Sequence, residues 1–379
     1  MKADVYIVDA YSNSLNGYNT FREELISILR GIDDIKLHLL TEEYPVRTIS
    51  TYHRDGIEYM YLPPIVENKF AKLEDYLRQV ITPSQHMIFI TNFFPAIFNL
   101  LAIKKLFPVA KIIHIIHDLP WLTLFQGNQS EYRHTLLENH TKKDFISYVT
   151  YDIVRSLTIV DKVISLCQST SDFISDAYGI PAEKQELISN GLPDIQEYIS
   201  NTDIGAICDK YNVPRDKKIV IYAGRLTKSK GADRIQPTIT TLTQEFPCHF
   251  IYAGADSIAE WIDDTAPFSL SSVGFLSRTE LFKLYALADI GLLTSRHEQC
   301  SFSGIELLMH GLPVISWPEF GVKDMFTPEN SILMPEGIKK LTKTHLSIIG
   351  RNARKTFLQK YNGTTMRQRY SQLIYSLLQ

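Results

Sequence analysis

Short apolar runs alternate with longer mixed segments along the first half of the chain. Each run is rich in valine, isoleucine or tyrosine, which is typical of a buried strand. Most runs are separated by enough residues for a helix, so the pattern predicts βαβ units. The predicted strands are residues 4–9, 36–40, 57–62, 87–91, 111–117 and 162–166.

A second series of the same kind follows Pro193, a residue that limits local helix formation. The chain is therefore expected to have an α/β fold with two Rossmann-like domains facing a cleft, joined by residues 190–204. The predicted strands of the second series are residues 218–223, 249–253, 272–276, 289–294, 313–317 and 331–334.

The end of the chain has apolar positions at helical spacing, interrupted near Asn362 and Gly363. We expect these C-terminal helices to cross back and pack toward the first domain. The predicted divisions are an N-terminal domain at 1–195, a C-terminal domain at 196–350 and the helices at 351–379.

The composition fits a globular protein of two domains. The chain has 379 residues, of which 45% are hydrophobic and 21% charged, and its net charge is −3. Because there is no surplus of positive charge, nucleic acid is not an expected partner. The oligomeric state is left open.

Neither a signal peptide nor a membrane span is predicted. The first residues lack a long apolar stretch, and no run reaches the ~18 apolar residues that a span needs. The expected location is cytoplasmic, with peripheral contact at the inner face of the membrane left open. The four cysteines are widely separated and are predicted to be reduced thiols: Cys167, Cys208, Cys248 and Cys300.

Glu298 and Glu306 are the most informative pair of residues in the sequence. They follow a predicted strand at 289–295, with a loop predicted at 298–304 and a helix starting at 305. In open α/β sheets, ligands bind beyond the carboxyl ends of strands, where carboxylates suit sugar hydroxyls. The pair indicates a sugar-nucleotide site, and the alternative is that both are ordinary surface or helix-capping carboxylates.

Arg225 and Lys230 lie five residues apart in the loop after the strand 218–223, between Gly224 and Gly231. Two cations at the start of a helix suit a diphosphate, because the helix N-terminus adds its own positive dipole. The alternative is a solvated basic loop.

These motifs occur in a defined order that resembles the retaining group 1 (family 4) glycosyltransferases, which have the GT-B fold. The segment GRLTKSKG matches the family form Gly-Arg-Leu-x-x-x-Lys-Gly, and the Glu-x7-Glu pair follows it. The matching segments are residues 224–231 (GRLTKSKG), 275–281 (FLSRTEL), 285–290 (YALADI), 298–306 (EQCSFSGIE) and 310–316 (HGLPVIS).

The resemblance implies that the second domain binds a nucleoside diphosphate sugar, such as a UDP- or GDP-sugar, and that the first domain binds the acceptor. Arg225 and Lys230 would stabilise the departing diphosphate. Glu306 would bind the ribose hydroxyls, and Glu298 would contact the donor sugar. The implied activity is transfer of the sugar to a hydroxyl of a glycan, lipid-linked sugar or peptide, with retention of configuration.

The segment between the two glutamates departs from the common Pro-Phe-Gly form, because residues 299–301 read Gln-Cys-Ser. An amide cradle for sugar and phosphate is still expected, with Gly304 bringing the chain close to the phosphate. By resemblance, Gly274 and Phe275 hold the nucleobase through main-chain groups. The residues assigned to the cradle are Ser301, Phe302, Ser303 and Gly304.

The first half of the chain matches the family more loosely. His117 and Asp118 resemble the family's His-Asp after a central strand, which implies that His117 contacts the donor sugar. Gly17 would let the backbone approach the ligand. The alternatives are a structural histidine and a plain Asn-Gly turn. His114 and His117 have a zinc-like spacing, but on a strand they point to opposite faces, so no metal site is expected.

No Asp-x-Asp triplet, the usual metal clamp for a diphosphate, occurs in the sequence. We therefore expect a metal-independent reaction that requires no cofactor. Two rival functions remain: a catalytically silent partner subunit that stabilises or positions an active glycosyltransferase, and a GT-B enzyme with another reaction, such as a phosphorylase or an epimerase.

Overall fold

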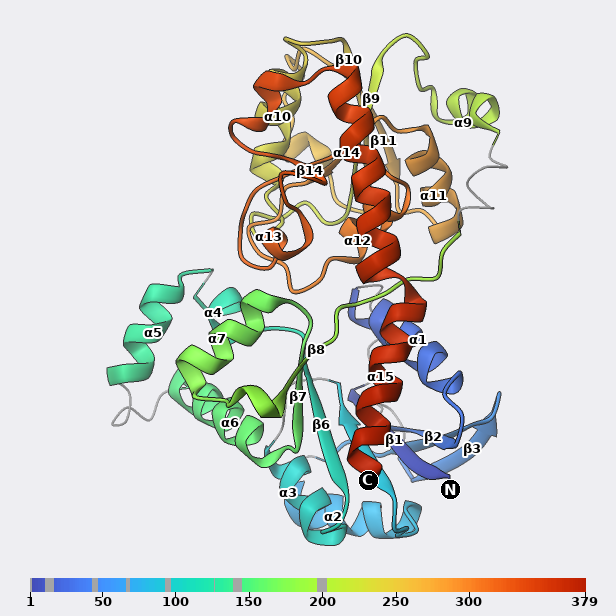
Figure 1. Cartoon of the computed structure of the whole chain (residues 1–379), viewed down its shortest axis with the longest axis vertical. Helices are drawn as coiled ribbons and strands as arrows, with labels where there is room; N and C mark the ends of the chain where they lie inside the picture. Colours follow the sequence, from blue (N-terminus) through green and yellow to red (C-terminus); the bar gives the residue numbers. More distant parts are fainter. Residues whose placement is uncertain are drawn as a thin grey trace. The chain divides into compact units, whose positions relative to one another are not determined.

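The computed structural model folds into two compact units (Figure 1). The first comprises Met1–Ser189 with Met366–Gln379, and the second comprises Asn190–Thr365. The structure describes residues 2–10, 17–42, 47–65, 69–92, 97–125, 127–138, 145–195 and 203–379.

The first unit contains an eight-stranded sheet in the order β3-β4-β2-β1-β5-β6-β7-β8. All neighbouring strands are parallel except β3 and β4, which are antiparallel. The strands are β1 (Ala3–Ala10), β2 (Ile35–Glu42), β3 (Ser50–Arg54), β4 (Ile57–Leu62), β5 (Met87–Thr91), β6 (Lys111–Ile116), β7 (Lys162–Ser165) and β8 (Gln185–Leu187).

The helices of this unit place apolar stripes against the sheet. In α1 the buried residues are Phe21, Leu25, Ile28 and Leu29, a spacing that puts them on one helical face. The helices are α1 (Gly17–Arg30), α2 (Lys69–Val80), α3 (Ile97–Leu106), α4 (Pro120–Thr123), α5 (Gln129–Glu138), α6 (Phe145–Ile159), α7 (Gln168–Tyr178) and α15 (Gly363–Leu378), whose residues from Met366 onward belong here.

The second unit contains a six-stranded parallel sheet in the order β11-β10-β9-β12-β13-β14. Its central strands β10 and β12 are buried at every position, as expected of a parallel sheet covered on both faces. The strands are β9 (Lys218–Ala223), β10 (Cys248–Ala253), β11 (Ser269–Gly274), β12 (Ile290–Leu293), β13 (Val314–Ser316) and β14 (Ser331–Leu333).

The helices of the second unit are α9 (Ile204–Tyr211), α10 (Ile235–Leu242), α11 (Arg278–Leu287), α12 (Phe302–Met309), α13 (Val322–Met325) and α14 (Lys343–Thr356). Four of them, α10 to α13, lie between strands of the sheet, α9 precedes its first strand and α14 follows its last. A π-helical turn at Phe357–Tyr361 follows α14, and Asn362 separates it from α15, so the predicted interruption is confirmed.

All twelve predicted strands are present, and two further strands were not predicted. Every residue of β3 is exposed, because this polar edge strand has no core face to require apolar residues. β8 has only three residues and no fully buried position. The strand predicted at 272–276 is wrong in its bounds: β11 ends at Gly274, where φ is 74°.

Candidate functional site in the second unit

The loop after β9 contains Arg225, and hydrogen bonds from two sides hold it. The Tyr222 hydroxyl donates to the main-chain oxygen of Arg225 at 2.8 Å. The amide of Leu226 donates to Asp256 Oδ2 at 2.6 Å. Tyr222 is on β9 and Asp256 follows β10, so two adjacent strand ends fix the start of the loop.

Gly231 closes this loop against the end of β12. Its φ is 68°, and a Cβ atom there would lie 2.0 Å from the main-chain oxygen of Thr294. The Thr294 hydroxyl donates to the main-chain oxygen of Lys230 at 2.7 Å. Glycine at 231 therefore allows the backbone contact that brings Lys230 beside the segment after β12.

Two arginines join the segments around the loop. Arg296 forms a two-point ion pair with Asp233, with both N–O distances 2.7 Å, and this contact lowers the pKa of Asp233. Arg234 donates to Glu319 at 2.6 Å and lies 4.9 Å from the centre of the Trp317 ring. Paired contacts of this kind fix orientation as well as distance, so the loop is preorganised.

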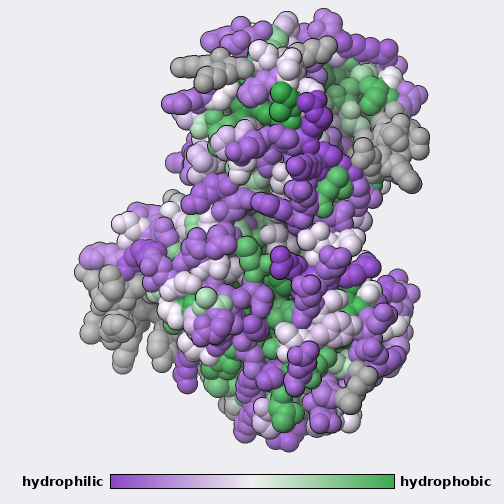
Figure 2. Space-filling model, viewed as in Figure 1, coloured by the Kyte–Doolittle hydropathy of each residue, from purple (hydrophilic) through white to green (hydrophobic). Residues whose placement is uncertain are grey.

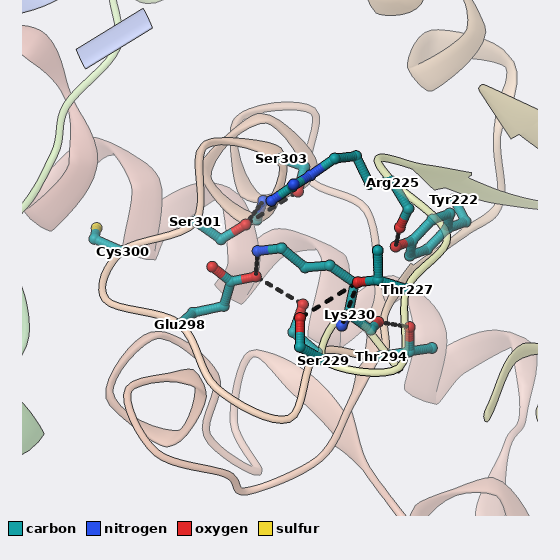
Figure 3. A network of polar contacts seen from close by, with 12 residues as sticks. Tyr222, Arg225, Thr227, Ser229, Lys230, Thr294, Glu298, Cys300, Ser301 and Ser303 are labelled. Atoms are coloured by element: carbon teal, nitrogen blue, oxygen red, sulfur yellow. Dashed lines mark hydrogen bonds and ion pairs between the residues drawn. The ribbon is translucent and has the colours of Figure 1, made fainter. Parts of the chain in front are cut away.

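Lys230 and Glu298 form an ion pair at 2.6 Å between Nζ and Oε1 (Figure 3). The Ser295 hydroxyl donates to the same oxygen at 2.7 Å. The Glu298 side chain is 11% exposed and that of Lys230 is 30% exposed. Within the described part of the chain, the second oxygen of Glu298 accepts no hydrogen bond, so it remains available to a hydroxyl.

Arg225 extends toward Ser301 and Ser303 at the start of α12 (Figure 3). It is exposed, and its guanidinium has no hydrogen bond or ion pair among the described residues. Ser301 caps α12: its Oγ accepts from the Gly304 amide at 3.2 Å and lies 3.0 Å from Ser303 Oγ. A free guanidinium thus faces a helix N-terminus, an arrangement that favours an anion.

The helix after Glu298 begins earlier than predicted. α12 starts at Phe302 rather than at 305, because Ser301 provides the N-cap. Glu306 consequently lies in the second helical turn and not in the first.

The missing side chain of Gly304 leaves room for neighbouring side chains: a Cβ there would lie 3.1 Å from Met325 and 3.2 Å from Phe326. Close packing against α13 therefore accounts for this glycine.

Glu306 is buried, at 8% exposure, and lies between two donors. The Tyr285 hydroxyl donates to Oε2 at 3.4 Å, and Arg278 Nε is 3.4 Å from Oε1. Burial, with the nearby Glu306 charge, raises the pKa of Tyr285 well above its ordinary value, so its hydroxyl stays protonated. Gly274 ends β11 shortly before Arg278, and Phe275 is 61% exposed.

His117 belongs to the first unit and directly follows β6. Its Nε2 atom is 2.8 Å from Asn92 Oδ1, and its ring meets the edges of Tyr18 and Phe21 at centroid distances of 5.5 and 4.5 Å. Burial lowers the pKa of His117 to about 3, so the ring is neutral at ordinary pH. Asp118 Oδ1 accepts from the amide of Leu119 at 2.8 Å and caps the following turn.

Gly17 is exposed and is the first residue of α1. His114 is buried with Nδ1 2.8 Å from Thr91 Oγ1. Over the ranges that the structure describes, no three His, Cys, Asp or Glu side chains gather to hold a metal ion. Residues 11–16 and 93–96 lie outside the described residues.

Sequence reasoning missed several residues of this site. Ser295 and Asp256 contact Glu298 and the loop of Arg225, yet neither belongs to a motif identified in the sequence. Arg278, which contacts Glu306, lies in the matching segment 275–281, but the motif itself gave it no role. Ser301 gave a usable signal, since serine is a preferred N-cap and an apolar helix follows it.

The second unit also matches known proteins in sequence. Residues 217–362 match the family described as glycosyl transferases group 1. We call this matched range the group 1 domain. The matched range contains Arg225, Lys230 and Glu298, which lie on the loops after β9 and β12, and Glu306, which lies on α12.

Two curated proteins are similar to this chain over part of its length. The O-antigen biosynthesis glycosyltransferase WclY of Escherichia coli is 26% identical over 202 residues, or 48% of this chain and 52% of that protein. The alpha-galactosylglucosyldiacylglycerol synthase of Streptococcus pneumoniae is 30% identical over 163 residues, or 38% and 41%. The chain spans about half the length of the curated relatives that it matches first.

The fold itself matches solved structures over almost the whole chain. Anabaena Alr3699/HepE, solved in complex with UDP and glucose, has a TM-score of 0.68 at 16% identity, covering 99% of this chain and 100% of that one. The likeness shows the GT-B fold, with two Rossmann-like sheets.

The helices and the surface bear on the membrane contact that the sequence left open. None of the helices in the described ranges has the length and apolar character needed to cross a membrane. On the face seen in Figure 2, hydrophobic residues occur in small groups among hydrophilic ones.

Proposed function

We propose that this protein transfers a sugar from a nucleoside diphosphate sugar to an acceptor hydroxyl, with retention of configuration. The observation that carries the proposal is the group formed by Arg225, Lys230 and the N-terminus of α12. These provide two cations and a helix dipole on loops that salt bridges already hold in place. Such preorganised positive charge suits a diphosphate leaving group.

The diphosphate accepts charge when the bond to the sugar breaks, and Arg225 and Lys230 neutralise that charge without a metal ion. Glu298 then orients the sugar through its unused oxygen rather than acting as a base, because Lys230 and Ser295 already hold its other oxygen. With no enzymic nucleophile assigned, the acceptor attacks from the same face, assisted by the leaving phosphate oxygen. Glu306 binds the ribose hydroxyls.

A UDP-sugar is the first donor to test, and a GDP-sugar is the second. The support is the HepE structure of the same fold, which was solved with UDP and glucose. For the acceptor, the names of the two relatives favour a glycan or a glycolipid hydroxyl over a peptide. His117 is assigned to a hydroxyl of the sugar substrate.

The test is a thermal-shift panel of UDP-, GDP-, ADP- and TDP-sugars with and without EDTA, followed by transfer assays with the donor that binds. We expect one nucleotide to raise the melting temperature in EDTA, and NMR of the product to show the donor's anomeric configuration. No shift at millimolar donor would favour a silent partner subunit instead. An inverted product would exclude the retaining mechanism.

A further inference from the structure

A chain of hydrogen bonds runs through the first unit from Asp9 to His117. The Tyr18 hydroxyl donates to Asp9 Oδ1, Asn92 Nδ2 donates to the Tyr18 oxygen at 3.4 Å, and His117 Nε2 lies 2.8 Å from Asn92 Oδ1. Asp9 is the next-to-last residue of β1, Tyr18 is on α1, and Asn92 and His117 directly follow β5 and β6. None of these residues lies in the range 217–362 that matches the glycosyltransferase family.

The charge of Asp9 determines which group donates in each hydrogen bond of this series. An ionised carboxylate only accepts, and Arg22 Nε, 3.8 Å from Asp9 Oδ2, favours the ionised form. The single hydroxyl hydrogen of Tyr18 is therefore used on Asp9. The Tyr18 oxygen can then only accept, so the amide nitrogen of Asn92 must face it.

The same reasoning fixes the proton on the imidazole. With its nitrogen toward Tyr18, Asn92 presents its oxygen to His117, and an oxygen needs a donor. The opposite amide orientation would place the Asn92 oxygen against the Tyr18 oxygen with no hydrogen between them. Asn92 is fully buried, so water does not readily relieve that conflict. Nε2 of His117 thus carries the hydrogen, and Nδ1 is left with a lone pair.

We propose that Asn92 is a positioning residue that holds His117 in the Nε2-H form and so presents Nδ1 as a hydrogen-bond acceptor for a hydroxyl of the sugar substrate. The described residues give Nδ1 no hydrogen bond, and the side chain is partly exposed. The tautomer assignment stands on the first unit alone. Only the role of Nδ1 toward a sugar rests on the proposed function.

Charged and titratable groups around His117 support the neutral ring. Asp9 and Arg22 form an ion pair at the other end of this hydrogen-bonded series, and His114 on β6 interacts electrostatically with His117. The ring edges of Tyr18 and Phe21 pack against His117 from α1. No carboxylate touches the ring in the described structure, so a neutral amide, rather than a charge, selects the tautomer.

The test is long-range 1H–15N NMR of the full chain labelled with 15N-histidine, with the His117 signals assigned from their loss in His117→Gln. We expect wild type to show a protonated Nε2 and an unprotonated Nδ1 at neutral pH. Asn92→Leu and Tyr18→Phe should give a mixture of tautomers. Asn92→Asp should keep a hydrogen on Nε2, because a carboxylate oxygen also requires a donor there. Phe21→Leu is the packing control and should leave the tautomer unchanged.

An Nδ1-H form or an imidazolium in wild type would overturn the proposal, as would an unchanged tautomer in folded Asn92→Leu. The tautomer is measured by NMR in the absence of substrate. A failure of the tautomer assignment can therefore be distinguished from a failure of the proposed function. If the tautomer is as expected, the role of Nδ1 predicts that Asn92→Leu lowers kcat/KM on the order of tenfold while Phe21→Leu does not. A folded Asn92→Leu with wild-type kcat/KM would contradict that role.

Discussion

The second unit takes its charged groups from two short stretches of sequence, whereas the first unit assembles its polar chain from residues far apart. Arg225 and Lys230 share one loop, and Glu298 and Glu306 flank another. Asp9 and His117, by contrast, are separated by more than a hundred residues and meet only because their strands end at one edge of the sheet. The charged residues of the candidate site lie in the second unit, whereas the hydrogen-bonded series in the first unit runs from the charged Asp9 to the neutral Asn92 and His117.

This difference predicts different sensitivities in the two units. Removing a cation from the second unit leaves developing phosphate charge unneutralised, which is an effect on the chemical step. Removing Tyr18 or Asn92 from the hydrogen-bonded series in the first unit changes which nitrogen of His117 accepts. This is an effect on how the substrate hydroxyl is oriented.

The largest effect is expected for the double variant Arg225→Ala with Lys230→Ala. Loss of one such group typically costs about 10²- to 10³-fold in kcat, and the pair should cost at least that much. The matched control is Lys228→Ala, whose exposed side chain lies in the same loop and whose main-chain oxygen alone contacts Arg296. The measurement is kcat from steady-state kinetics. A transfer rate of the double variant within about tenfold of wild type would contradict the assignment of Arg225 and Lys230 to the phosphates.

Gly231→Ala should destabilise the second unit by at least about 3 kcal/mol. A left-handed φ costs an alanine roughly 1 kcal/mol, and the clash with Thr294 adds to it. Gly274→Ala is the control, since its φ is 74° but nothing lies within 4 Å of its Cβ position, so only the backbone cost applies. Urea unfolding measures both. Equal losses of stability would show that the loop is not clamped as described.

Glu306→Gln should raise the donor KM by about 10- to 100-fold and change kcat less. The reason is that ribose contacts bind ground state and transition state alike. The charge removed also faces Arg278 at 3.4 Å, so the melting temperature of the free variant must be measured beside the kinetics. An unchanged donor KM in a stable variant would show that Glu306 does not bind the ribose.

The smallest effect, counted per pH unit, is expected from the titration of one histidine in the first unit. Burial, with a further contribution from His117, lowers the pKa of His114 to about 3, against about 6.5 in the unfolded chain. Between these values the unfolded chain binds more protons, so stability falls as the pH drops from 6.5 toward 3. His114→Gln should flatten the slope by up to about 1.4 kcal/mol per pH unit. An unchanged slope in acid would mean that His114 protonates in the folded unit.

Much of the fold could be predicted because a parallel sheet buried on both faces requires continuous apolar runs. The ranges predicted for β4, β5 and β9 agree with the structure to the residue. The exposed strand β3 faces no such requirement, so its polar sequence gave no signal.

The site was predictable where its residues are neighbours in sequence. Lys230 and Glu298 each stood out through their own motif, although their 2.6 Å contact did not. Asn92 could not be recognised, because its role depends on Tyr18 and His117 reaching it from other elements. The early start of α12 followed from the capping of one serine, a local effect that apolar periodicity does not register.

The most direct test of the account is isothermal titration of UDP-glucose and GDP-mannose into wild type and Lys230→Ala, both in EDTA. We predict saturable binding of one donor by wild type and at least tenfold weaker binding by the variant. Binding that requires a divalent metal, or equal affinity in the two proteins, would contradict the assignment of the diphosphate to Arg225 and Lys230.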